Sequence, residues 1–358
     1  MTPVDWLLYG ANGYTGELVA RLAVERGLRP ILAGRRAEPV ARLAAELGLP
    51  YRIADLASPS ALAGALDGVR VVAHCAGPFA ATAAPMVRAC PAAGAHYLDV
   101  TGEIDVFEWI FERDSSARAA GVVLLPGAGF DVVPTDCLAV SLAGALPGAT
   151  HLDLAFLVGG GMSRGTTVTS LAGIGAGSLR RVDGVLVATP LGTPRRVVPF
   201  PRSGRREVGG VRWGDLATAY RSTGIPNITT YTRVPFQGAA VRPLGWAATA
   251  VLGVGPVRRV ADRLVRTRVT GPDAAVRART RCEVWGEVRD GAGDARTASV
   301  VGPNAYDLTA DSVVRAVGFL GAGIGPAGPV PPGAHTPATA FGAGYLALLD
   351  GVTVSAPV

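Results

Sequence analysis

The sequence predicts a doubly wound parallel α/β sheet joined to an α+β second domain with a largely antiparallel sheet. Three observations lead to this prediction. A glycine-rich turn separates the first apolar run from a helical pattern. Residues 1–126 then alternate apolar runs with helical periodicity. Beyond Pro134 the chain is dominated by alternating, β-branched segments.

The first domain is expected to form parallel strands, because each apolar run is followed by a helical stretch that returns the chain to the same edge. The apolar runs lie at residues 6–9, 30–33, 51–55, 69–75, 95–100 and 122–126. Helical patterns lie at 60–66, 84–93 and 104–119. Ligands of such sheets bind outside the carboxyl ends of the strands, so the residues that follow each strand are the first candidates for a site.

The second domain is expected to be rich in strands. Strand-like segments lie at residues 151–158, 184–190, 195–200, 227–234, 282–290 and 295–301, with helical stretches near 166–181 and 246–264. Residues 309–320 and 337–349 return to a helical pattern and are expected to pack on the first domain, after a Pro/Gly-rich loop at 321–334. We therefore assign residues 1–130, completed by about 309–350, to the first domain and 131–308 to the second.

The glycine turn is a spacing variant of the dinucleotide-binding fingerprint. Gly10, Gly13 and Gly16 form GxxGxxG. In such turns the first glycine allows the turn, the second lets a pyrophosphate approach the backbone, and the third lets the helix pack on the strand. The helix N-terminus offers N–H groups and partial positive charge. This context favours a Rossmann-like cofactor site over a glycine turn that binds nothing.

The residues after the second strand predict which cofactor binds. Arg35 and Arg36 stand where an acid would bind the ribose 2′-hydroxyl of NAD. Guanidinium groups instead suit a 2′-phosphate, because they form bidentate, charge-assisted bonds with it. The pair predicts NADPH over NADH; the alternative is two solvated arginines before a helix. The candidate cofactor contacts are Gly10, Ala11, Asn12, Gly13, Tyr14, Thr15, Gly16, Gly34, Arg35, Arg36, Asp55, Cys75, Ala76, Gly77, Pro78 and Phe79.

Composition excludes several function classes. The net charge is +6 without a dense basic run, which disfavours nucleic acid and fits an anionic cofactor or substrate. The chain contains no lysine, so a lysine Schiff base and a Tyr-x-x-x-Lys pair are impossible. Four cysteines without CxxC spacing predict reduced thiols, a cytoplasmic location and no metal site.

No signal peptide is expected, because the chain starts with a predicted strand. The most apolar stretch, residues 244–257, is shorter than the roughly 20 residues of a spanning helix. We interpret it as a buried or dimer-interface helix, with shallow membrane contact as the alternative.

Several motifs together resemble one family of oxidoreductases. They are YGANGYTGE, AGRR, HCAGPF, GAHYLDVTGE, PGAGFDVVPTDCLA, SRGTT, WGDLATAYRSTGIPN and HTPATAFG, which run nearly from end to end. The chain resembles the saccharopine dehydrogenase-like oxidoreductases of bacterial type and is more distantly similar to trans-acting enoyl reductases of polyketide lipids. The resemblance implies an NADP-binding Rossmann domain, a second domain that closes over the substrate and forms a homodimer, and hydride transfer. It leaves the substrate open.

Candidate catalytic residues follow the predicted strands. Tyr97 and Asp99 share one face of the strand at 95–100, and Asp131 follows the strand at 122–126. We expect Tyr97 to donate a proton while Asp99 or Asp131 sets the local charge. The alternative for Asp99 is N-capping of the next helix. Asp215 and Tyr220 lie in a stretch interpreted as strand-like that would face the cleft; the alternative is an ordinary half-buried sheet.

Further residues are candidates for substrate binding: Thr101, Glu103 and Phe130 in the first domain, and Ser163, Arg164 and Thr166 in the second. The second set precedes a helix and would suit a carboxylate or phosphate. The alternative for that set is a capped helix start.

These observations predict an NADPH-dependent oxidoreductase that transfers hydride to a C=N or an activated C=C bond of an unidentified small molecule. The expected partners are that substrate and a second copy of the chain, without nucleic acid or stable membrane insertion. The alternatives are a non-catalytic NADPH-binding sensor and a membrane-peripheral protein.

Overall fold

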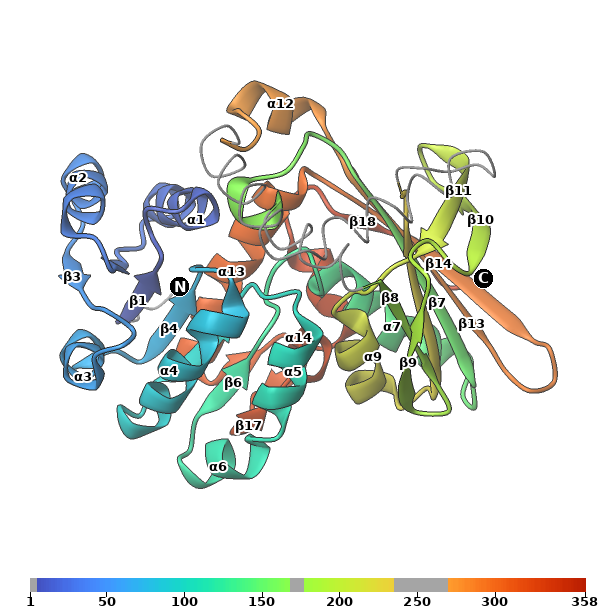
Figure 1. Ribbon diagram of the computed structural model, residues 1–358, viewed down its shortest axis with the longest axis horizontal. Coiled ribbons are helices and arrows are strands. Elements are labelled where there is room, and N and C mark those ends of the chain that lie inside the picture. Colours follow the sequence, from blue (N-terminus) through green and yellow to red (C-terminus); the bar gives the residue numbers. More distant parts are fainter. Residues whose placement is uncertain (1–4, 168–176, 235–269) are drawn as a thin grey trace. The chain divides into compact units, whose positions relative to one another are not determined.

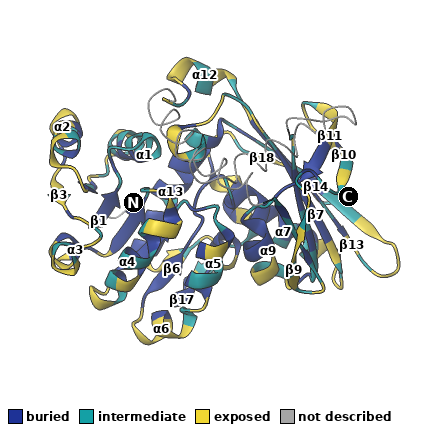
Figure 2. Ribbon diagram, in the orientation of Figure 1, coloured by how far each residue is buried: buried dark blue, intermediate teal, exposed yellow. Residues whose placement is uncertain are grey.

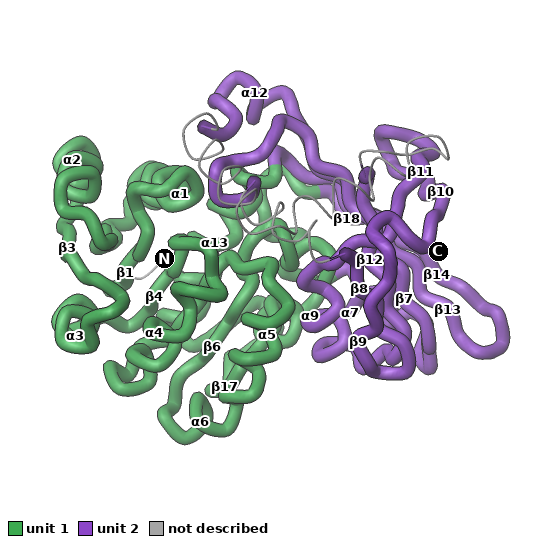
Figure 3. The backbone as a smooth tube through the Cα atoms, in the orientation of Figure 1, with its two compact units in different colours: residues 1–137, 305–352 green, residues 138–304, 353–358 purple. Residues whose placement is uncertain are grey.

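The computed structural model describes residues 5–167, 177–234 and 270–358. The chain forms two compact units, coloured separately in Figure 3. Unit 1 comprises Met1–Cys137 and Ala305–Val352, and unit 2 comprises Leu138–Asn304 and Thr353–Val358. The predicted helical stretch at 246–264 and the apolar stretch at 244–257 lie outside the described residues. Among those residues, no helix is both long and apolar enough to cross a membrane.

Unit 1 is built on a parallel sheet of seven described strands in the order β17-β6-β5-β4-β1-β2-β3 (Figure 1). The strands are β1 (Trp6–Tyr9), β2 (Ile31–Gly34), β3 (Tyr51–Ile53), β4 (Val71–His74), β5 (His96–Asp99), β6 (Val123–Leu125) and β17 (Gly333–Ala334). Every residue of β1, β4 and β6 is buried, as Figure 2 shows in dark blue, which explains their continuous apolar runs. The predicted parallel Rossmann-like sheet is confirmed.

Helices connect these strands. They are α1 (Tyr14–Glu25), α2 (Ala37–Leu47), α3 (Pro59–Leu66), α4 (Phe79–Ala92), α5 (Ile104–Phe111), α6 (Asp114–Ala119), α7 (Val133–Ala145), α13 (Ala305–Ala322), α14 (Pro337–Phe341) and the 3-10 helix η2 (Ala343–Leu348). The single helix predicted at 104–119 is wrong, because two separate helices, α5 and α6, occupy this range. The prediction of a loop at 321–334 is only partly right, because this range contains the hairpin of β15 (Ile324–Gly325) and β16 (Gly328–Pro329) and the sheet strand β17.

Ion pairs join the C-terminal part of unit 1 to the end of α1, its first helix. α13 packs along α1. The buried carboxylate of Asp311 in α13 receives Arg26 Nη1 at 2.6 Å and Arg315 Nε at 2.7 Å. The two arginines also bind Asp350, at 2.8 and 2.7 Å, and the backbone N–H of Asp350 donates to Asp311. Residues that are distant in sequence therefore close one ion network.

Unit 2 contains a mixed sheet in which most neighbours are antiparallel. Its main path is β10-β11-β12-β7-β13-β14-β18, with β8 paired to both β12 and β9. The strands are β7 (His151–Val158), β8 (Ser178–Val182), β9 (Val185–Thr189), β10 (Arg195–Phe200), β11 (Gly204–Gly210), β12 (Asn227–Thr232), β13 (Cys282–Arg289), β14 (Ala295–Gly302) and β18 (Thr353–Val354). Only the pair of β7 and β12 is parallel among the described strands of this sheet. The predicted α+β second domain is confirmed.

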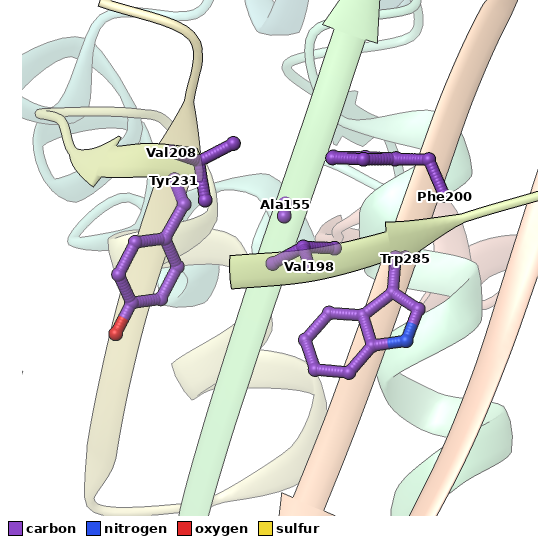
Figure 4. Close-up of a cluster of buried hydrophobic side chains, with 6 residues drawn as sticks. All are labelled: Ala155, Val198, Phe200, Val208, Tyr231 and Trp285. Atoms are coloured by element: carbon purple, nitrogen blue, oxygen red, sulfur yellow. The ribbon is translucent and has the colours of Figure 1, made fainter. Parts of the chain in front are cut away.

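The core of this sheet is an aromatic and aliphatic cluster on one face. Figure 4 shows its six buried side chains, which come from five strands: Ala155, Val198, Phe200, Val208, Tyr231 and Trp285. The alternation of buried residues along β10 places Val198 and Phe200 on the same face.

Two sequence predictions in unit 2 need correction. The stretch interpreted as strand-like around Asp215 and Tyr220 is a helix, α9 (Asp215–Thr223). Gly224 ends it in the left-handed region at φ +71°, a signal for a helix C-terminus. The helical stretch predicted at 166–181 is wrong at its end, because β8 begins at Ser178. One further short helix, α12 (Ala274–Arg279), follows residue 269.

Candidate functional site

The glycine turn between β1 and α1 is shaped by close backbone contacts. Gly10 has φ +83°, and a Cβ there would lie 2.8 Å from the backbone nitrogen of Ala76. A Cβ on Gly16 would lie 2.3 Å from the carbonyl oxygen of Gly10. Gly13 is the N-cap of α1 and supplies no side-chain cap. The backbone therefore leaves no room for a side chain at Gly10 and Gly16, and the first turn of α1 leaves its N–H groups available, as a pyrophosphate site requires.

The end of β2 carries the two arginines. Arg35 and Arg36 are exposed, and neither forms an ion pair with another residue in the described ranges. Gly34 before them is enclosed, since a Cβ there would meet Asn12 Oδ1 at 3.1 Å. Asp55, which follows β3, is exposed, and its carboxylate accepts the N–H of Ala57. Two exposed guanidinium groups beside a glycine cradle fit the 2′-phosphate and pyrophosphate of NADP.

The last residue of β4 is an unexpected buried histidine. His74 is fully buried, and neither ring nitrogen has a hydrogen-bond partner in the described part of the chain. Its ring centroid lies 5.4 Å from that of Tyr9, 5.5 Å from Phe79 and 6.1 Å from Tyr97. Burial lowers the pKa of His74 to about 3, so the ring is neutral. Burial also raises the pKa of the Cys75 thiol to about 12, which excludes a thiolate there at neutral pH.

Tyr97 and Asp99 form a fully buried pair on one face of β5. The hydroxyl of Tyr97 donates to Asp99 Oδ2 at 2.7 Å. Asp99 Oδ1 accepts the backbone N–H groups of Thr101 and Gly127, both at 2.9 Å. Burial raises the pKa of Asp99 to about 6, although these three donors stabilise its charged form. The geometry gives Asp99 a role in joining the loops that follow β5 and β6.

Glu103 holds the start of a different helix from the one it precedes. Its two carboxylate oxygens accept the N–H groups of Phe79 at 2.8 Å and Ala80 at 2.9 Å, in the first turn of α4. Its own N–H donates to the side chain of Thr101 at 3.1 Å. Thr101 is fully buried. Both residues, expected to bind substrate, are therefore engaged in contacts within the protein.

The loop after β6 places the remaining unit 1 candidates. Phe130 is buried, and its N–H donates to Thr309 Oγ1 of α13 at 3.0 Å. Asp131 is half-buried, and a Cβ on Gly102 would lie 2.9 Å from its Oδ2. Burial raises the pKa of Asp131 to about 6. Asp131 thus combines a half-buried position with a pKa close to neutrality.

The unit 2 candidates come from two segments, α9 and the helix start at 163–166. Asp215 is fully buried in the first turn of α9. Tyr220 is 36% exposed, with its ring 4.1 Å from the guanidinium carbon of Arg181. Ser163 accepts the N–H of Thr166 at 3.3 Å, which is a cap at a helix start. Arg164 is exposed.

Sequence reasoning missed three of these features. It placed residue 74 in the strand at 69–75 but did not predict that its ring lies among aromatic side chains. It also missed the Glu103 contacts with α4 and the contact of Thr309 with Phe130. Each depends on residues that meet only in the fold, and no local pattern indicates them.

Comparisons with known proteins agree with the geometry of unit 1. Residues 6–125 match the family model described as the saccharopine dehydrogenase NADP binding domain. A trans-acting enoyl reductase of Mycobacterium leprae (strain TN) is 37% identical over 145 residues, 37% of this chain and 34% of that protein. A human saccharopine dehydrogenase-like oxidoreductase is 25% identical over 280 residues, 70% of this chain and 64% of that protein. The chain thus spans about a third to two thirds of these relatives' length.

A solved structure shares the fold across both units. Apo histidine-tagged saccharopine dehydrogenase (L-Glu forming) from Saccharomyces cerevisiae superimposes with a TM-score of 0.63, covering 99% of this chain and 100% of that one at 13% identity. This likeness concerns the fold alone. The predicted cofactor is confirmed by the matched domain, which contains both the glycine turn and the arginines. Residues 6–125 thus carry the features of a saccharopine dehydrogenase NADP binding domain, and the chain is similar to saccharopine dehydrogenase-like oxidoreductases and trans-acting enoyl reductases.

Proposed function

We propose that this protein is an NADPH-dependent oxidoreductase that reduces a C=N or an activated C=C bond of a small molecule. The observation that best supports this function is the glycine turn, together with Arg35 and Arg36, which are exposed at the end of the next strand. The relatives named as enoyl reductase and saccharopine dehydrogenase-like oxidoreductase support a reduction but leave the acceptor bond open.

In this proposal, different residues bind the pyrophosphate and the 2′-phosphate of NADPH. The first turn of α1 and the Gly10–Gly16 backbone hold the pyrophosphate through N–H groups. Arg35 and Arg36 hold the 2′-phosphate. When bound, NADPH supplies the hydride.

Asp131 is our candidate for the proton donor in unit 1, because it is half-buried and its pKa is raised. A general acid works best when its pKa lies near the working pH, and burial brings the pKa of Asp131 to about 6. Tyr97 and Asp99 are buried and hydrogen-bonded to each other, so we propose that they stabilise the surrounding loops. Asp215 and Tyr220 remain candidates from unit 2.

The cofactor assignment is tested by calorimetry with NADPH and NADH. Arg35→Ala should weaken NADPH binding about 10-fold or more and leave NADH binding nearly unchanged, because only NADPH carries the 2′-phosphate. Arg29→Ala, which removes an arginine whose side chain donates to the carbonyl of Gly48, is the control. Equal losses for both cofactors would remove the assignment.

The enzyme class is tested by following NADPH oxidation in absorbance with panels of imines and enoyl compounds. Turnover of members of either panel supports a reductase and names the acceptor bond. NADPH binding without turnover of any member would favour the sensor instead.

We also propose a cytoplasmic homodimer. The four cysteines are all free thiols in the structure, which suits a reducing compartment. Dimerisation is implied by the family resemblance. Light scattering at micromolar concentration should give twice the mass of the 36.5 kDa chain; a monomer, together with sedimentation on liposomes, would favour the membrane-peripheral alternative.

A further inference from the structure

The loop after β4 lies directly against the glycine turn. A Cβ on Gly10 would lie 2.8 Å from the nitrogen of Ala76 and 2.9 Å from the carbonyl carbon of Cys75. The N–H of Cys75 also donates to the carbonyl of Tyr9, the last residue before the turn. Any displacement of the loop at 75–80 therefore changes the surface that the turn presents to a dinucleotide.

The far end of this loop is held from another strand. Phe79 and Ala80 begin α4, whose N-cap residue, Pro78, supplies no side-chain cap. The carboxylate of Glu103 replaces that cap with one oxygen on each N–H, at 2.8 and 2.9 Å. Glu103 lies 24 residues further along the chain than Phe79, just after β5. The helix N-terminus adds a favourable interaction with the negative charge.

Glu103 is itself fixed by a buried path of hydrogen bonds. Its N–H donates to Thr101 Oγ1, the N–H of Thr101 donates to Asp99, and Asp99 accepts the hydroxyl of Tyr97. Asp99 also accepts the N–H of Gly127 after β6. The path begins in the interior of β5 and ends at the loop that touches the glycine turn.

We propose that Glu103 is a positioning residue that sets the affinity for NADPH by holding the loop at 75–80 against the glycine turn. This inference rests on the NADPH site of the proposed function. Glu103 touches neither substrate nor cofactor in this role, and it acts through Phe79 and Ala80. The buried pair of Tyr97 and Asp99 holds Thr101 in place, and Thr101 in turn holds Glu103.

The carboxylate is necessary because both backbone donors need an acceptor. A glutamine at this position has one acceptor oxygen, and its NH₂ group would face the second N–H. Glu103→Gln keeps the size of the side chain, so it removes one hydrogen bond and the charge without creating a cavity. Charge-assisted bonds of this kind are roughly twice as strong as neutral ones.

The test compares Glu103→Gln with Glu112→Gln, a matched change at a residue whose side chain is 73% exposed. Fluorescence titration should show NADPH binding about 10-fold weaker in Glu103→Gln and unchanged in Glu112→Gln. Adenosine 2′-monophosphate, which carries the 2′-phosphate but has no phosphate at the 5′ position and no nicotinamide, should bind both variants like the wild type. General destabilisation of unit 1 would weaken both ligands instead.

Hydrogen exchange gives an independent reading. Without ligand, peptides covering residues 75–84 should exchange faster in Glu103→Gln than in the wild type, while peptides of α2 should not change. If Glu103→Gln does not fold, Thr101→Val removes the acceptor of the Glu103 N–H in an isosteric side chain and should give the same changes on a smaller scale.

The outcomes separate the two claims. If the wild type binds NADPH and Glu103→Gln binds it within twofold, or if both ligands weaken equally, the role of Glu103 is wrong and the proposed function stands. If the wild type does not bind NADPH at all, the proposed function fails and this inference fails with it.

Discussion

His74 shows how a single residue can carry a cost in stability. Its two ring nitrogens are buried without partners in the described residues, and its folded pKa of about 3 lies far below the usual value of about 6.5. The unfolded chain therefore binds a proton between these values that the folded chain does not. Above pH 6.5 this proton linkage does not reduce the free energy of unfolding. Below pH 6.5 the free energy of unfolding falls by about 1.4 kcal/mol per pH unit.

We predict that His74→Leu removes this acid sensitivity. Near pH 7.5 the variant should be as stable as the wild type or more stable, because unsatisfied buried polar atoms cost about 1–3 kcal/mol. At pH 5 its advantage should have grown by about 2 kcal/mol. Urea unfolding at both values measures the change. Parallel pH dependences in the two proteins would mean that His74 is hydrated or paired in solution.

Asp131 gives a second prediction at this scale. Its pKa is raised, so the protonated acid is depleted as the pH rises through about 6, and turnover should fall on that side of the pH profile. Asp131→Asn should lower turnover by about 10²–10⁴ and abolish this limb, while NADPH affinity stays the same. Steady-state rates from acid to alkaline pH decide it. Near-normal turnover in the variant would transfer the search to Asp215 and Tyr220.

Some residues were predictable because their signals are local. Gly10, Gly16, Arg35 and Arg36 occupy fixed positions beside strands that the apolar runs reveal. Glu103 was named as a site residue but with a different role, because its partners in α4 are fixed by the order of the strands and not by its neighbours in sequence.

At the scale of elements, the ion network between α1 and α13 makes a testable contrast. Asp311 is only 6% exposed and receives two arginines and a backbone N–H, whereas Asp350 in the same network is 71% exposed. We predict that Asp311→Asn costs about 2–4 kcal/mol of the free energy of unfolding, because it removes the buried carboxylate that both arginines share and leaves them only the exposed carboxylate of Asp350. Asp350→Asn should cost under about 1 kcal/mol. Denaturant titration of both variants measures this, and equal costs would contradict it.

The elements differ in how visible they were in the sequence. The strands of the parallel sheet were predicted because short, continuous apolar runs between turn signals are typical of strands that are buried on both faces. β17 was missed, since Gly333 and Ala334 have no strand propensity and join β6 only through backbone pairing. The strand predicted at α9 is wrong because the aromatic and acidic residues of the helix continue a strand-like pattern that begins before it, whereas Gly224 is a local signal for a helix C-terminus.

At the scale of the whole molecule, the sheet order places the cofactor site within unit 1. β4, β5 and β6 follow β1 on one side of the glycine turn, and β2 and β3 lie on the other. The loops that end β4, β5 and β6 are therefore neighbours, which is why Asp99 and Glu103 can connect them. The arginines of β2 lie on the opposite side, where the adenosine end of a dinucleotide belongs.

The path of the chain through its two units has a consequence for dissection of the protein. Most of unit 2 is an insertion: the chain leaves unit 1 after Cys137, re-enters it at Ala305 and returns to unit 2 at Thr353. A fragment that stops at residue 137 would contain the matched NADP-binding segment yet lack α13, the strand β17 and Asp311. It would expose the apolar side of α1 and leave Arg26 without its acids. Autonomous folding should instead be sought by splicing residues 1–137 directly to 305–352, so that the cofactor domain is recovered from two segments that are distant in sequence.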